Sequence, residues 1–279
     1  MLHYGHSSPP SGAPLDGPGL LGALDGPGAA RPVPHLFGAP ALSDPGSGSG
    51  AVRLREAVNL VPAERSEALN RALNIVIAGI ALLILAPVCV LVALLIKLTS
   101  PGPVFYTQTR VGLDRRWRRP AGDADDDRRL EDLGGQPFTI LKFRSMRTDA
   151  EANGQAVWAT KHDARITPTG RVLRKTRLDE VPQLINVLRG EMNIVGPRPE
   201  RPSIVVRLCE HVREYPVRHR VKPGITGWAQ INHSYDASIE DVRTKVRYDL
   251  EYIGRQGLLF DVKIMCLTLP VMLFKKGAH

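Results

Sequence analysis

One uncharged stretch restricts this chain more than any other feature of its sequence. Residues 75 to 96, "IVIAGIALLILAPVCVLVALLI", are 22 consecutive residues without a charged side chain. As an α-helix, at about 1.5 Å per residue, they would extend roughly 33 Å, close to the thickness of the hydrocarbon core of a bilayer. The stretch lies too far into the chain for a cleavable signal peptide. The sequence therefore predicts a membrane helix.

Two features of this segment bear on how it meets the membrane. Pro87, near its middle, removes a backbone donor and kinks a helix. Basic residues lie on both sides, so the positive-inside rule gives no orientation; they are Arg53, Arg55, Arg65 and Arg71 before it and Lys97, Arg110, Arg115 and Arg116 after it. A helix that enters one leaflet, turns at Pro87 and returns fits both features. A kinked helix that spans the bilayer remains the alternative.

The C-terminal segment "GLLFDVKIMCLTLPVMLFKK" is a second membrane candidate. Asp261, Lys263 and Pro270 interrupt its apolar run, so it would span a bilayer poorly. It is typical of an amphipathic helix at the membrane interface, with Lys275 and Lys276 at the level of the headgroups. An amphipathic helix packed on a protein core is the alternative.

Composition separates the first part of the chain from the rest. The first fifty residues contain nine prolines and eleven glycines, which predicts a flexible tail; we place its end at residue 66. The whole chain carries a net charge of +9, and because the first fifty residues contribute −2 the remainder carries +11. This excess favours anionic partners such as phosphate esters, acidic lipids or nucleic acid. The three cysteines form no C-x-x-C pair, so no thiolate zinc site is indicated.

The remaining segments predict an α+β fold that is mostly helical. The β-rich stretches 101–112 and 136–150 are expected to form a small sheet or hairpin. Between them, residues 116–135 carry dense charges of both signs, and we interpret their acidic cluster (Asp123, Asp125, Asp126 and Asp127) as part of a solvated loop and not as a metal site. The expected organisation is a tail over 1–66, the membrane helix over 67–98 and one domain over 99–279.

The candidate chemistry lies in "LRKTRLDEVPQLINVLRGEMNIVGPRPE", residues 173–200. An apolar helical pattern follows Asp179 and Glu180 and closes at Gly190, so the plainest interpretation makes Asp179 a helix N-cap with Glu180 favouring the helix dipole. Five nearby cations favour a phosphate site instead; they are Arg171, Arg174, Lys175, Arg177 and Arg198.

In such a field of positive charge we expect an ionised carboxylate, because nearby cations lower its pKa. From an open cationic pocket, one of the two carboxylates could then attack phosphorus while the other helps to hold Mg²⁺, which needs few protein ligands. Farther on, Trp228 in "KPGITGWAQIN" is expected to pack in the core or at an interface, with stacking on a nucleobase as the lesser alternative. The segment "VRYDLEYI" is expected to be helical.

Five ordered motifs resemble the bacterial sugar transferases, specifically the monotopic phosphoglycosyl transferases that move a hexose 1-phosphate onto a polyprenyl phosphate. The motifs are "SPGPVFYTQTRVG", "FTILKFRSM", "DARITPTGRVLRKTRLDEVPQLINVLRGEMNIVGPRPERP", "PGITGWAQIN" and "YDLEYI…FDVKI". The resemblance runs from about residue 69 to residue 274. It implies a catalytic domain on the cytoplasmic face of a bacterial inner membrane, with a re-entrant membrane helix. Family members break this helix at Ser-Pro, whereas this chain has Ala86-Pro87.

The resemblance also implies a reaction and roles for individual residues. Asp179 would attack a UDP-sugar, release UMP and hold a covalent phosphosugar, which undecaprenyl phosphate would then accept to start an exopolysaccharide, capsule or O-antigen. Glu180 would complete the dyad and, with Asp179, bind Mg²⁺. The implied substrate-binding residues are Lys142, Arg144, Arg174, Arg198 and Asp261. The expected partners are the UDP-sugar, polyprenyl phosphate and membrane lipid, but not nucleic acid; a homo-oligomer stays open.

Two rival interpretations remain at this stage. In one, the carboxylates only bind Mg²⁺ and the lipid phosphate attacks the UDP-sugar directly. In the other, the chain is a non-catalytic basic module that is anchored in the membrane and binds anionic lipid or nucleic acid. The second alternative explains the charge and the apolar segment, but not an acidic pair behind a run of cations.

Overall fold

The computed structural model describes four ranges of the chain, residues 60–118, 134–150, 163–233 and 238–274. Most of the expected tail over 1–66, and most of the charged loop over 116–135 with its acidic cluster, lie outside these ranges. Both therefore stay predictions.

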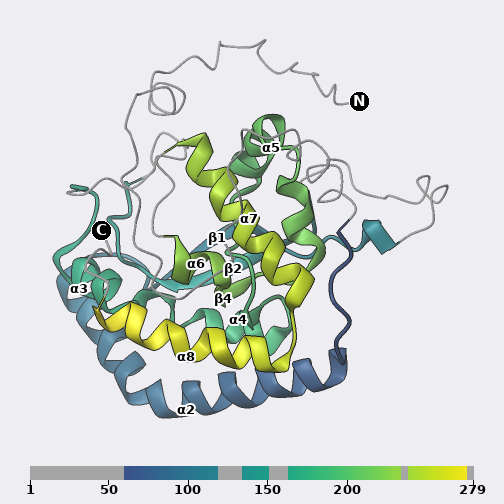
Figure 1. Ribbon diagram of the computed structural model, residues 1–279. Helices are drawn as coiled ribbons and strands as arrows, with labels where there is room; N and C mark the ends of the chain where they lie inside the picture. The colour runs from purple at the N-terminus through teal and green to yellow at the C-terminus, as the bar shows by residue number, and fades with distance from the viewer. Residues whose placement is uncertain (1–59, 119–133, 151–162, 234–237, 275–279) are drawn as a thin grey trace, which may run out of the picture.

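The apolar segment forms α2 (Glu67–Thr99), as the sequence predicted. Ser66 caps its start by accepting a hydrogen bond from the backbone N–H of Leu69 at 3.3 Å. The helix is continuous through Pro87 and ends at Ser100, whose N–H donates to the carbonyl of Ile96. Figure 1 shows α2 along the lower edge of the molecule, turning upward at the left. It is the one described helix that is long and apolar enough to cross a membrane.

Two small sheets lie above this helix. β1 (Phe105–Val111) and β2 (Pro137–Phe143) pair antiparallel, which confirms the predicted hairpin. β3 (Asn193–Val195) and β4 (Gly224–Thr226) form a parallel pair that the sequence did not indicate. The two backbone segments approach closely just beyond β3, where a Cβ on Gly224 would lie 2.1 Å from the backbone nitrogen of Gly196.

Helices make up most of the rest, in agreement with the expected α+β class. They are η1 (Arg116–Arg118), α3 (Pro168–Thr176), η3 (Leu178–Glu180), α4 (Gln183–Arg189), α5 (Pro202–His211), η4 (Tyr215–Arg220), α6 (Trp228–Asn232), α7 (Ile239–Arg255) and α8 (Leu258–Phe274). Gly190 closes α4 with a left-handed φ of 84°, as predicted. The helix expected over "VRYDLEYI" is confirmed as part of α7.

Both halves of α2 pack on the same body. Before Pro87, Ala78 lies in a cluster with Ile140 of β2 and Val187 of α4. After Pro87, Val92 and Ile96 lie in a second cluster, whose other buried members are Phe143 of β2 and Leu173 of α3. The membrane-helix candidate is therefore part of the hydrophobic core.

The ends of α2 are tied to that body by hydrogen bonds. Near its start, the Arg71 guanidinium donates to the backbone carbonyls of Val187 and Leu188 at the end of α4. At its last residue, the hydroxyls of Thr99 and Thr169 lie 2.8 Å apart, which joins the helix to α3. The two ends of α2 thus contact one folded unit.

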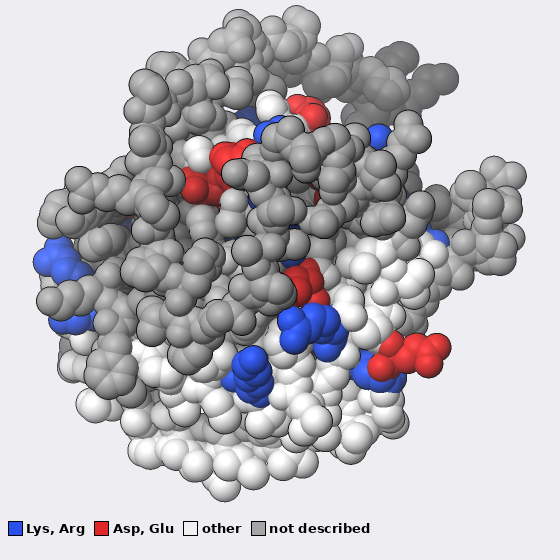
Figure 2. All heavy atoms as spheres, viewed as in Figure 1, with Lys and Arg blue, Asp and Glu red and all other residues white. Residues whose placement is uncertain are grey.

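The opposite side of α2 is apolar and uncovered. Its most exposed residues include Leu83 and Ile84, which are 77% and 67% exposed, and Leu98. Figure 2 shows an uncharged lower surface in this region, with Lys and Arg side chains above it. An exposed apolar surface of this extent marks an interaction site with a membrane or a partner.

The C-terminal segment is a helix, α8, that continues through Pro270. One side of it faces inward, with Ile264 in a core cluster. The other side exposes apolar residues, above all Leu259 and Leu269. The segment thus has the buried side expected of a helix packed on a protein core, and also the exposed apolar side expected of an interfacial helix. The same core cluster holds Trp228, which is 6% exposed and confirms the prediction of core packing.

Candidate active site

The two carboxylates lie on η3, between α3 and α4. Arg177 precedes them in the left-handed conformation with φ of 60°, the only non-glycine residue with positive φ in the described ranges. Its carbonyl accepts the N–H of Glu180 at 3.1 Å. Because a side chain in this conformation costs about 1–2 kcal/mol, the surrounding packing must hold the turn in place.

This geometry corrects the interpretation of Asp179 as the N-cap of the following helix. α4 begins only at Gln183, with Pro182 in the cap position and no side-chain cap bond. Asp179 instead lies inside the separate 3-10 turn, where both carboxylates are directed into the protein and are buried. The backbone bonds that lead into α4, from Val181 N to Leu178 O and from Leu184 N to Val181 O, join residues three apart, so the α-helical pattern of α4 does not extend back to Asp179.

Glu180 is the paired member of the dyad. The Lys142 ammonium donates to its Oε1 at 3.0 Å, and the Arg198 guanidinium donates to both of its carboxylate oxygens. Burial alone would raise the pKa of Glu180, but the charges of Arg198 and Lys142 outweigh it and hold this pKa well below its ordinary value. Glu180 is thus a fixed anion that brings two cations together.

Asp179 is the unpaired member. It is 7% exposed, and its Oδ1 is buried without a hydrogen-bond partner. Burial, followed by the charge of Glu180, raises the pKa of Asp179 against the opposing charges of Lys142, Arg174 and Arg198. The expected open carboxylate with a lowered pKa is therefore wrong in both respects. The physical reason is that burial, together with the adjacent charge of Glu180, outweighs the three cations.

The five cations expected around the dyad divide into two groups. Arg198 contacts it directly, and Arg174 lies near enough to act on the pKa of Asp179 while its Nε donates to Ser145 Oγ at 3.2 Å. The side chains of Arg171, Lys175 and Arg177 are exposed. The direct contacts of the dyad thus come from Arg198 and from Lys142, which the family resemblance named.

Two residues named by the resemblance do not join the dyad in the structure. The buried Arg144 donates to the carbonyls of Ser100 and Pro101, both at 2.8 Å, and so ties the end of α2 to the hairpin. Asp261 accepts from the Tyr252 hydroxyl at 2.9 Å and faces Arg65 at 3.6 Å. Burial raises the pKa of Asp261. Their substrate-binding roles remain predictions.

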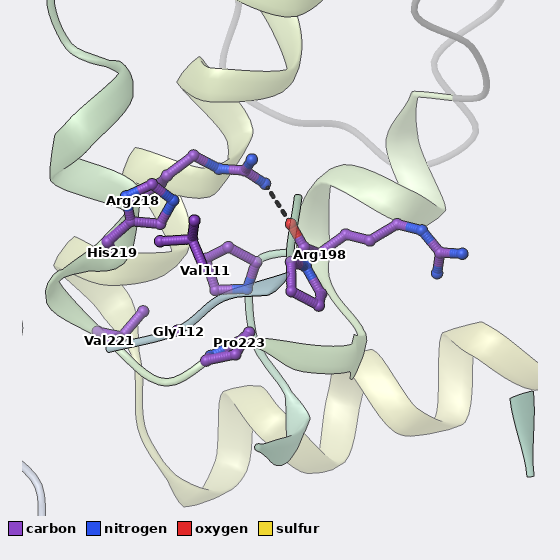
Figure 3. A pocket seen from close by; sticks show the side chains of 9 residues that line it. Val111, Gly112, Arg198, Arg218, His219, Val221 and Pro223 are labelled. Carbon is purple, nitrogen blue, oxygen red and sulfur yellow. Dashed lines mark hydrogen bonds between the residues drawn. The ribbon is translucent and has the colours of Figure 1, made fainter. Parts of the chain in front are cut away.

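Arg198 reaches Glu180 from the loop between β3 and α5. Behind this loop, a pocket of about 10 Å³ (Figure 3) has room for roughly one water molecule. Figure 3 also shows Arg218 donating to the backbone carbonyl of Arg198, at 2.9 Å. Arg218 was not among the site residues predicted from the sequence, although its position in the basic run "VRHR" is a signal for it.

The carboxylates fit a magnesium ion with few protein ligands. In the described ranges no three His, Cys, Asp or Glu side chains form a cluster that could hold a metal ion alone. Mg²⁺ commonly binds one or two carboxylates together with substrate phosphates and water. The unpartnered Oδ1 of Asp179 is a suitable ligand atom, whereas a metal at Glu180 would share that carboxylate with Lys142 and Arg198.

This chain is similar to one family of proteins over most of its length. A family model described as "Bacterial sugar transferase" matches residues 65–275. The UDP-glucose:undecaprenyl-phosphate glucose-1-phosphate transferase of Escherichia coli K12 is 41% identical, over 76% of this chain and 41% of the relative. An undecaprenyl-phosphate N-acetylgalactosaminephosphotransferase of Aeromonas hydrophila is 39% identical, over 79% of this chain and 47% of the relative.

The chain thus spans less than half the length of these two relatives. It matches a larger share of the exopolysaccharide production protein PSS of Rhizobium leguminosarum bv. phaseoli. That protein is 38% identical over 71% of this chain and 91% of the relative.

Proposed function

Because this chain belongs to the bacterial sugar transferases, we propose that it transfers a sugar 1-phosphate from a UDP-sugar to undecaprenyl phosphate. The activities for which the relatives in Escherichia coli and Aeromonas hydrophila are named support this proposal. The product, a lipid-linked diphosphate sugar, would begin an exopolysaccharide, capsule or O-antigen unit. The name of the Rhizobium relative supports an exopolysaccharide role.

The observation that carries the proposal is the unequal pairing of the dyad. Glu180 is held by Lys142 and Arg198, whereas Oδ1 of the adjacent Asp179 has no partner. A purely structural pair of acids would leave no buried acceptor unsatisfied, since such a group costs about 1–3 kcal/mol. Phosphoryl transfer needs this combination of a free nucleophile and fixed positive charge.

In the proposed reaction, a carboxylate oxygen of Asp179 attacks the phosphorus that carries the sugar. A bond forms between this oxygen and phosphorus, the bond from that phosphorus to the UMP oxygen breaks, and UMP leaves with the electron pair. A phosphate oxygen of undecaprenyl phosphate then attacks the same phosphorus, which restores the Asp179 carboxylate. Lys142 and Arg198 neutralise phosphate charge during both steps.

We propose Mg²⁺ as the cofactor, with Asp179 and Glu180 as its protein ligands. When bound, the ion would neutralise charge on the diphosphate. The residues of this chain perform the rest of the chemistry. Asp179 supplies the attacking oxygen, Glu180 keeps Lys142 and Arg198 in place, and burial of the dyad excludes water from the covalent adduct.

We also propose that α2 is re-entrant and that the catalytic body lies on the cytoplasmic face of the inner membrane. Both ends of α2 are bonded to this body, at Arg71 and at Thr99. A helix that spanned the bilayer would separate these ends by the thickness of the membrane. The exposed apolar residues of α2 and α8 would then contact lipid.

The proposed function is tested by incubating the full chain with a panel of UDP-sugars and no lipid acceptor. We expect release of one UMP per enzyme and a gain in protein mass equal to one phosphosugar. Adding undecaprenyl phosphate should discharge the adduct. Asp179→Asn should abolish both signals while membrane association persists.

The same experiment separates the alternatives. Transfer that depends on the lipid but proceeds without an adduct would support direct displacement by the lipid phosphate. No UMP release with any UDP-sugar, together with retained binding to anionic vesicles, would support the non-catalytic basic module. Unchanged turnover of Asp179→Asn would eliminate Asp179 as the nucleophile.

A further inference from the structure

The loop that carries Arg198, residues 196–200, is held mainly through its carbonyl groups. Pro197 and Pro199 have no N–H, so they can accept hydrogen bonds but cannot donate them. Four consecutive carbonyls of the loop each accept a bond. Pro197 accepts from Gly224 N at 3.0 Å, Arg198 from Arg218 at 2.9 Å, Pro199 from Arg110 at 3.1 Å and Glu200 from Val111 N at 2.9 Å.

Arg218 donates the hydrogen bond to the carbonyl of Arg198. The Arg218 guanidinium is also held by other partners. Its side chain is fully buried, with the whole residue 1% exposed. Nε and Nη2 approach Oδ2 of Asp249 at 2.9 and 2.8 Å, and Nη1 donates to the Tyr215 hydroxyl at 2.7 Å. With a carboxylate, a phenol and a carbonyl arranged around one guanidinium, Arg218 has little freedom to move.

This bond restrains the part of the Arg198 backbone that its neighbours leave free. The ring of Pro199 confines Arg198 to an extended conformation, because the residue before a proline avoids the helical region. The extended region of backbone conformations is broad, so the carbonyl of Arg198 can still turn through tens of degrees. A small rotation there would displace the guanidinium that bonds Glu180, since the side chain starts at the same α-carbon.

We propose that Arg218 is a positioning residue for transfer, which holds the backbone carbonyl of Arg198 so that its side chain reaches Glu180 and the phosphates. The proposal rests on the proposed function in that Arg198 is taken to act on substrate. Lysine could pair with Asp249 but could not also reach two further acceptors, because its ammonium lacks the forked shape of a guanidinium.

Stability alone does not explain this buried ion pair. Buried ion pairs can often be replaced by apolar residues of similar volume without loss of stability, whereas removing one partner is strongly destabilising. The test variant is therefore the double substitution Arg218→Met with Asp249→Leu, made in the full chain. We expect the chain to stay folded with a lower unfolding midpoint, because the buried Tyr215 hydroxyl and the Arg198 carbonyl each lose a donor, while kcat for UMP release falls about 10- to 100-fold, as for a displaced catalytic group.

A second arm shows whether the loss acts through Arg198. The double substitution is repeated in an Arg198→Ala background, where we expect little further loss because the positioned side chain is already absent. Replacing the ion pair of Arg116 and Asp114, which lies beyond β1 and bonds none of the four loop carbonyls, is the matched control. Arg116→Met with Asp114→Leu should leave turnover near that of the wild type.

Hydrogen exchange gives a readout that does not depend on activity. The loop amides of Gly196, Arg198 and Glu200 should exchange faster in the Arg218→Met, Asp249→Leu chain, whereas those of α4 should not change. Retained turnover, equal losses in both Arg198 backgrounds or unchanged exchange of the loop would each overturn the proposal. If the wild type releases no UMP, the proposed function fails, and the exchange result still decides whether Arg218 holds the loop.

Discussion

Lys142 of β2 donates to Oε1 of Glu180 at 3.0 Å, which joins the hairpin to the turn that carries the dyad. Burial lowers the pKa of Lys142, while the charge of Glu180 raises it. Each of the two groups therefore makes burial of the other tolerable. This pair gives the dyad its asymmetry, because the cation that neutralises Glu180 leaves Asp179 without a bonded partner.

Removing the carboxylate of Glu180 should therefore be costly. Glu180→Gln leaves Lys142 and Arg198 without their anion, and breaking a buried pair in this way costs about 3 kcal/mol or more. We expect a lower unfolding midpoint in denaturant together with loss of transfer. Glu240→Gln, at an exposed pair with Arg243, is the control and should change the midpoint little. Equal midpoints for the two variants would contradict the proposed pairing.

Asp179→Asn should have the opposite effect on stability. A raised folded pKa means that Asp179 favours folding below its unfolded pKa of about 3.9, and that this contribution is lost as the pH rises through the folded value. At pH 7 the wild type therefore buries an unpaired charge that asparagine lacks. We expect Asp179→Asn to be more stable by about 1 kcal/mol and inactive. A less stable variant would show that the carboxylate contributes to folding at pH 7.

The pH dependence of kcat/KM should report the same carboxylate. Asp179 must be ionised to attack, and its pKa is raised by burial, so activity should fall as the pH drops through a value above 3.9. Lys142 lowers the pKa of Asp179, so Lys142→Met should move this acid limb to higher pH while reducing the rate. A limb that stays in place or moves to lower pH would argue against Asp179 as the group observed.

His219 should make the fold sensitive to mild acid. Burial, followed by the charge of Arg218, lowers the pKa of His219 to about 3. The neutral ring then favours folding above the unfolded pKa of about 6.5, and this contribution is lost as the pH falls below it, by about 1.4 kcal/mol per pH unit. Stability measured from pH 7 to pH 5 should therefore fall less steeply in His219→Gln. His211→Gln, on the exposed end of α5, should keep the slope of the wild type.

Labelling can test whether α2 is re-entrant. In a chain whose native cysteines Cys89, Cys209 and Cys266 are replaced, single cysteines at the exposed positions Glu64 and Pro101, just outside the two ends of α2, should both react with a membrane-impermeant reagent from the cytoplasmic side only. Labelling of one position from each side would show that the helix spans the bilayer. Both results are read in intact cells and in inverted vesicles, which expose opposite faces.

The sequence predicted best those features that recur over many residues. The charge-free run of α2 and the two strands of the hairpin are long enough to show a pattern, and Gly190 marks the end of α4 through its positive φ. The parallel pair of β3 and β4 was missed because three residues per strand show no periodicity. Its pairing depends on close backbone contact at Gly224, which only the folded chain reveals.

The sequence predicted which residues belong to the candidate site better than it predicted the contacts between them. Sequence motifs named Asp179, Glu180, Lys142 and Arg198, and the structure brings these four together. The same motifs could not show that Arg144 is engaged by the carbonyls of Ser100 and Pro101. Charge density along the chain also overestimated the local cations, because the direction of each side chain on α3 decides whether it faces the dyad or solvent.

Because α2 packs into the hydrophobic core, this helix cannot be removed without disturbing the rest of the fold. Ala78, Val92 and Ile96 complete two of the hydrophobic clusters on which the hairpin and α4 rest. A truncated form that lacks this helix would expose those clusters to water, and we expect it to aggregate. Under the proposed membrane placement, insertion of α2 at the lipid surface and completion of the folded core would be a single event.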